Sequence, residues 1–169
     1  MSAFPRLFVA CAMLLVPAAA AGAPVAAKTN ATGSVALLRP LTLLKKANLD
    51  FGELVATGAG TAVIDPVSGA TTVTGPLTPV GTAGHPATFT ATGSKNSVVI
   101  IRIPSSALTL TNPAGGTMTV SNWTLDGKTN RRIAQNNAFD FSVGATLNVG
   151  AGQPDGIYSG TFQVTVQYP

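Results

Sequence analysis

The last stretch of the chain, Gly156 to Tyr168, alternates apolar and polar residues, and this alternation constrains the fold more than any other feature. One side carries Tyr158, Gly160, Phe162, Val164, Val166 and Tyr168, and the other carries Ser159, Thr161, Gln163, Thr165 and Gln167. Because successive side chains of an extended chain point to opposite faces, a period of two predicts a β-strand with one buried face. We expect this strand to pair with an earlier segment or with another molecule.

Short segments rich in valine and threonine recur along the rest of the chain, separated by glycine and proline turns. We predict a first strand over residues 48–54 and a dense central strand over 98–103. A long strand is expected over 139–149, where every second residue from Phe139 to Val149 is apolar, with a bend or break at Gly144. A strand near Met118–Leu125 changes phase at Ser121-Asn122, which indicates a bulge, and residues 126–137 are expected to form a loop. With no helical periodicity outside the N-terminal segment, these signals predict an all-β, antiparallel immunoglobulin-like sandwich.

The N-terminal residues have the order of a secretory signal peptide. Arg6 precedes the short apolar run Leu7–Val16, and small residues follow. We expect a signal peptide over 1–23, with cleavage between residues 20 and 27, an N-terminal extension over 24–39 and one domain over 40–169. Cleavage removes Cys11, the single cysteine, so no disulfide is expected, and the mature chain has no predicted transmembrane segment.

Charge and reactive residues are sparse. The formal net charge of +4 falls to +3 without Arg6, and the basic residues are scattered, so no nucleic-acid partner is expected. His85 is the single histidine and has no recognisable nucleophile motif around it, so we expect no enzyme. Metal sites and cofactors are not expected either, because a mature chain with one histidine and no cysteine lacks the usual ligands of transition metals. Asp126–Asn130 resembles part of a calcium loop but lacks its closing glutamate.

Two further patterns have structural and functional interpretations. Asn30-Ala31-Thr32 and Asn122-Trp123-Thr124 match the N-glycosylation acceptor pattern, which also arises by chance. Trp123 has the ring needed to stack on a sugar, but its apolar neighbourhood favours a place in the core.

The final stretch resembles the C-terminal strand of chaperone-usher pilus subunits. That resemblance rests on the penultimate Tyr168, on the alternating Phe162, Val164 and Val166, and on Gly156, which is fourteenth from the end counting Pro169 as first. A second resemblance covers roughly residues 35–169 and is to a pilin-like family of small secreted proteobacterial domains of unknown function. It rests on Pro40-Leu41-Thr42, Leu49-Asp50-Phe51-Gly52, Gly144–Gly150 and Gly156–Phe162.

The resemblance to pilins implies an incomplete sandwich whose hydrophobic groove is filled first by a strand of a periplasmic chaperone and then by the extension of the next subunit. The C-terminal residues Gly156, Tyr158, Phe162, Val164, Val166 and Tyr168 would then contact the subunit or chaperone. Residues 28–38, with Val35, Leu37 and Leu38, would be the donor strand. The extension alternates poorly, however, and lacks the cysteines that form a disulfide in many pilins.

These observations predict a structural subunit of a bacterial surface fibre or coat, exported to the periplasm and then to the cell surface or fimbrium. Its expected partners are like subunits, a periplasmic chaperone and an usher. The alternative is a self-contained secreted β-sandwich that binds carbohydrate or protein at the cell surface. The two hypotheses differ in whether residues 28–38 fold back into their own sheet.

Overall fold

The structure is a computed structural model that describes residues 28–169. The predicted signal peptide and Cys11 lie outside the described residues. The chain divides into two units, residues 1–35 and 36–169, and every strand belongs to the second unit.

The second unit is built of antiparallel strands, and the described residues contain no helix. The strands are β1 (Thr42–Ala47), β2 (Asp50–Ala56), β3 (Gly60–Ile64), β4 (Thr71–Thr74), β5 (Leu77–His85), β6 (Ala87–Thr92), β7 (Val98–Arg102), β8 (Leu108–Thr111), β9 (Thr117–Leu125), β10 (Asn130–Arg132), β11 (Ala138–Val149) and β12 (Thr165–Gln167). The predicted all-β, antiparallel class is therefore confirmed.

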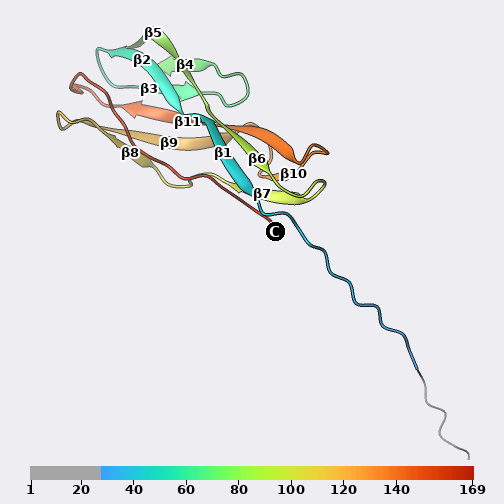
Figure 1. Cartoon of the computed structure of the whole chain (residues 1–169). Helices are drawn as coiled ribbons and strands as arrows, with labels where there is room; N and C mark the ends of the chain where they lie inside the picture. Colours follow the sequence, from blue (N-terminus) through green and yellow to red (C-terminus); the bar gives the residue numbers. More distant parts are fainter. Residues whose placement is uncertain (1–27) are drawn as a thin grey trace, which may run out of the picture. The chain divides into compact units, whose positions relative to one another are not determined.

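The longest strand, β11, organises the seven-stranded sheet (Figure 1). Its first half pairs with β6 and its second half with β3, while β9 pairs with residues from Val143 to Asn148. Because Thr146 and Leu147 pair with both β3 and β9, those two strands lie on opposite edges of β11. The strands β1, β4 and β8 extend the sheet beyond β6, β3 and β9.

Alternation explains why β11 is central. Its buried positions Phe141, Val143, Ala145, Leu147 and Val149 follow a period of two, as predicted from the sequence. The predicted bend also lies where expected, since the register with β9 shifts between Gly144 and Thr146. On β9 the shift falls at Asn122, whose φ of 50° marks the predicted bulge.

Two smaller sheets complete the fold, β10-β7-β12 and β2-β5. Residues of β6, β7 and β11 share one buried cluster that includes Phe89, Ile101 and Phe141, and the rings of Phe89 and Phe141 stack with centroids 5.2 Å apart. Half-buried side chains of the final stretch pack against this cluster. A second cluster lies around Ala62, Val120 and Leu147.

Two sequence predictions were wrong. Residues 50–54 of the predicted first strand do lie in a strand, β2, but β1 precedes it. The strand β1 lies at a sheet edge where most side chains are exposed on both faces and no alternation is required. The predicted loop over 126–137 contains β10, which pairs with β7 through its backbone and carries no apolar pattern of its own.

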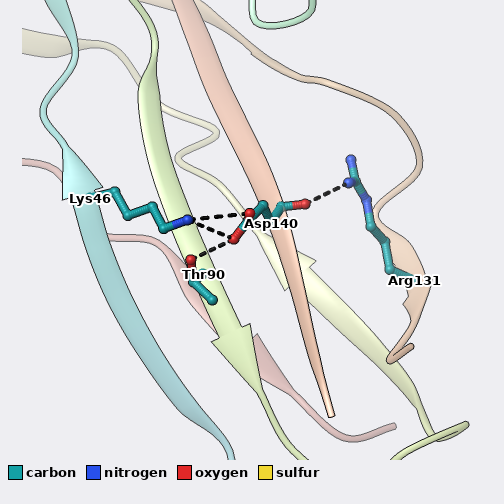
Figure 2. Close-up of polar contacts among 4 residues, drawn as sticks. All are labelled: Lys46, Thr90, Arg131 and Asp140. Carbon is teal, nitrogen blue, oxygen red and sulfur yellow. Dashed lines mark hydrogen bonds and ion pairs between the residues drawn. The ribbon is translucent and has the colours of Figure 1, made fainter. Parts of the chain in front are cut away.

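A polar cluster lies on the exposed face of the seven-stranded sheet. Figure 2 shows Lys46 of β1 and Thr90 of β6 on one side of Asp140 and Arg131 on the other. The Lys46 ammonium lies 3.3 Å from the Asp140 carboxylate, and the Thr90 hydroxyl donates to that carboxylate. The Thr90 hydrogen bond, followed by the Lys46 interaction, holds the pKa of Asp140 below its ordinary value of 3.8.

Asp140→Asn should lower stability at neutral pH by less than about 1 kcal/mol, because exposed ion pairs are weak. A lowered folded-state pKa contributes stability above the unfolded-state pKa, and that contribution is lost as the pH falls through the folded-state pKa. The variant and the parent should therefore converge at pH values well below 3.8. Urea unfolding at neutral and strongly acidic pH measures this, with Asp155→Asn as the control.

Gly144→Ala should destabilise the protein by about 2 kcal/mol, as overpacking does in other cores. A Cβ at Gly144 would lie 2.1 Å from the Ile64 carbonyl oxygen and 2.9 Å from Pro66 Cδ. At Gly150 a Cβ would meet only the flexible end of Gln153, so Gly150→Ala is the matched control. Equal unfolding midpoints in urea for the two variants would contradict this account of the bend.

Candidate functional site

The final stretch has the predicted two faces. Its apolar positions Tyr158, Phe162, Val164, Val166 and Tyr168 are half-buried, while the intervening polar residues are exposed. The predicted continuous strand is wrong in extent, however, since only Thr165–Gln167 forms a strand, β12. Ser159 instead makes a two-residue bridge to Thr111 of β8. The stretch therefore changes partner from β8 to β7, and residues 160–164 between them form no strand (Figure 1).

The backbone of Val166 faces away from β7. Ile101 donates its backbone N–H to Thr129, on the β10 side of β7. Val166 lies opposite Ile101 in the antiparallel ladder, and two opposite residues direct their polar backbone groups either both toward or both away from each other. The N–H and C=O of Val166 therefore point to the outer edge of β12, which pairs with no further strand of the described residues.

Apolar side chains of the final stretch reach the buried cluster. The ring of Phe162 lies against that of Trp123 on β9, with centroids 4.7 Å apart. Trp123 Nε1 donates to the Ser106 carbonyl at 3.0 Å, and the residue is half-buried against both hydrophobic clusters. The expected place of Trp123 in the core is confirmed.

Tyr168 anchors the end of the chain. Its hydroxyl accepts the Ser94 N–H at 2.9 Å and donates to the Arg39 carbonyl at 2.8 Å. Gly93 permits this approach, because a Cβ there would lie 2.8 Å from the tyrosine hydroxyl and 2.7 Å from Leu41. The penultimate aromatic residue thus ties the C-terminus to the segment that leads into β1.

Gly156 and Tyr158 have local contacts. Gly156 has a φ of 132°, and a Cβ there would lie 2.8 Å from the buried Asn112 side chain. The Tyr158 hydroxyl lies 2.7 Å from the Pro154 carbonyl and 3.1 Å from Gln153 Oε1. These two predicted interaction residues shape the turn before the final stretch.

The strand β1 presents a second unpaired edge, since among the described residues only β6 pairs with it. Leu43 lies opposite the buried Ala91 and is 37% exposed, so an apolar side chain at this edge is incompletely covered. Leu44, on the other face, is 65% exposed.

The predicted donor residues belong to no strand. Residues 28–41 have no regular secondary structure. Leu37 and Leu38 of the second unit are 92% and 50% exposed, and Val35, in the first unit, is 86% exposed.

The residues considered for catalysis or metal binding, His85 and Asp126, have only local polar contacts. His85 ends β5, and its Nδ1 lies 3.3 Å from the Pro86 carbonyl oxygen. Asp126 forms an ion pair with Arg131, whose Nε also donates to the Lys128 carbonyl. Within residues 28–169, no three side chains of His, Cys, Asp or Glu gather as metal ligands, and no helix is long and apolar enough to cross a membrane.

Sequence reasoning missed a groove of about 450 Å³ beside the final stretch. It lies between the loop that follows β7 and residues 161–165, and Arg102, Ser105, Ser106, Thr161, Gln163 and Thr165 contribute its polar lining. The one local signal is Pro104-Ser105-Ser106, which interrupts the dense apolar run of β7.

Comparison with known proteins gives one family. The family model described as "Domain of unknown function (DUF4402)" matches residues 41–168. No curated protein and no solved structure matches the chain. The predicted relation to a family of domains of unknown function is confirmed at this level, and the resemblance to pilins stays a prediction.

Tyr168→Phe should destabilise the protein by about 1 kcal/mol, because the half-buried Ser94 amide and the Arg39 carbonyl lose a common partner. Urea unfolding measures the loss. Gln167→Ala, at the exposed neighbouring position, should leave the midpoint unchanged. A Tyr168→Phe variant as stable as the parent would show that packing of the ring alone anchors the terminus.

Proposed function

We propose that this chain, which belongs to the DUF4402 family, is a structural subunit of a bacterial surface fibre or coat and has no enzymatic role. Addition of a β-strand from a neighbouring molecule assembles the fibre. One observation carries the proposal. The edges of β1 and β12 are unpaired within the described residues, and each lies beside apolar side chains that remain partly exposed.

An unpaired edge beside an apolar face is a template for another strand. Its free N–H and C=O groups supply main-chain hydrogen bonds, and uncovered apolar side chains supply burial. At β12 the Val166 backbone offers the hydrogen bonds, while Phe162 and Val164 are half-buried on the core side. At β1 Leu43 offers apolar surface. An incomplete immunoglobulin-like sandwich has these properties.

The donor in this proposal is the segment 28–38 of the next subunit. It contains the exposed apolar residues Val35, Leu37 and Leu38, and no strand of its own fold uses it. Burying an exposed leucine side chain contributes roughly 2 kcal/mol, so two leucines and one valine give the pairing a substantial apolar component. Export through the periplasm would bring the subunit to the cell surface, with a chaperone and usher covering the same edge until assembly.

The test compares a chain that starts at residue 28 with its Leu37→Asp and Thr32→Asp variants by size-exclusion chromatography with light scattering. The parent should form oligomers whose mass rises with concentration. Leu37→Asp should remain a monomer, because a carboxylate would have to be buried against apolar side chains. Thr32→Asp adds the same charge outside the apolar positions and should assemble like the parent.

Addition of a peptide with the sequence of residues 28–38 supplies the second arm. It should bind the Leu37→Asp monomer and raise its unfolding temperature, because a ligand that binds only the folded state stabilises it. Monomers from all three chains, with no effect of the peptide, would contradict strand complementation.

A further inference from the structure

The groove beside the final stretch arises where two strand pairings separate. Ser159 pairs with Thr111 of β8, and Thr165 pairs with Arg102 of β7. Two segments connect these pairs: residues 103–110 and residues 160–164. The first segment is the longer one. The longer segment therefore bows outward, and a groove of about 450 Å³ remains between them.

The outer wall of this groove is polar and carries one cation. By the alternation of the final stretch, Thr161, Gln163 and Thr165 lie on its exposed side, and Ser105 and Ser106 face them from the loop. Arg102 is exposed on β7 and forms no salt bridge with the described residues. Its guanidinium therefore remains available to an anion.

The remaining lining is apolar. Ile103, Pro104 and Leu108 line one side of the groove. Phe162, whose side chain lies on the core side of the final stretch, lines the other. The groove is open to solvent, so a ligand would lie along it, in contact with both its apolar surface and its polar groups. A sugar ring presents both hydroxyl groups and C–H faces, and so matches this mixture.

We propose that the groove binds an oligosaccharide bearing carboxylates, with Arg102 pairing one uronate carboxylate. A planar guanidinium and a carboxylate form two parallel hydrogen bonds, which fixes the sugar in one orientation. Hydroxyl and amide groups of Ser105, Thr161 and Gln163 exchange hydrogen bonds with the sugar hydroxyls. A neutral or acidic protein segment has fewer hydroxyl groups than a saccharide to exchange hydrogen bonds with this wall.

The polar wall of the groove is separate from the apolar residues that strand assembly would use, although Phe162 borders both. Groove side chains such as Thr161 and Gln163 lie on the face of the final stretch opposite Phe162 and Val164. A monomer and an assembled subunit would both bind the saccharide, so failure of one proposal leaves the other standing.

Isothermal titration of the chain from residue 28 with a trisaccharide of galacturonic acid tests the proposal. Binding should be detectable at millimolar or lower concentration. The methyl-esterified trisaccharide and the Arg102→Gln variant should each bind about tenfold more weakly, as expected for loss of one charge-assisted pair. Lys95→Gln removes an equal charge from an exposed turn outside the groove and should bind like the parent.

Backbone amide chemical shifts give the second readout, because they also report that each variant is folded. Saccharide should shift the amides of Ser105, Ser106 and Gln163 in the parent, and the same shifts in Arg102→Gln should require about tenfold more saccharide. No binding by the parent, equal binding of the ester, or equal weakening by Lys95→Gln would overturn the proposal. Tighter binding of a glutamate tripeptide than of the saccharide would replace the saccharide with an acidic peptide.

Discussion

The pairing of β11 along both of its edges is the interaction on which the rest of the sheet depends. Thr146 and Leu147 hold β3 on one edge and β9 on the other, and the first half of the strand holds β6. The same strand buries a continuous apolar row, because every second side chain faces the core. Because β11 is paired along both edges, the outer strands form the edges of the sheet. The unpaired backbone of β1 follows from this arrangement.

Local alternation made β11 and the two faces of the final stretch predictable, because each has water on one side and the core on the other. The strand β1 was missed since Leu44 and its neighbours are exposed at an edge, where the side-chain pattern carries no information. The three residues of β10, Asn130–Arg132, pair with β7 but have no apolar alternation from which a strand could be predicted. The end of the chain was predicted as one strand, but its change of partner from β8 to β7 depends on the length of the loop after β7, which no local pattern encodes.

In the candidate site, too, local alternation predicts which residues are apolar but not which distant residues they contact. Tyr168 and Phe162 were predicted as apolar positions, and they pack as such, but the hydrogen bonds of the Tyr168 hydroxyl to Ser94 and Arg39 join residues distant in sequence. The groove could not be predicted because Arg102 and Gln163 meet only in the folded chain. The two faces of the final stretch give the protein two separate surfaces: one side completes a hydrophobic cluster, and the other forms a polar groove wall.

The proposed assembly depends most directly on the outer edge of β12. Amide hydrogen exchange at Val166 measures its state, since this N–H points away from β7. We expect rapid exchange in the Leu37→Asp monomer and strong protection in oligomers of the parent chain, with unchanged exchange at Thr165. Equally rapid exchange of the Val166 amide in monomers and oligomers would contradict assembly through this edge.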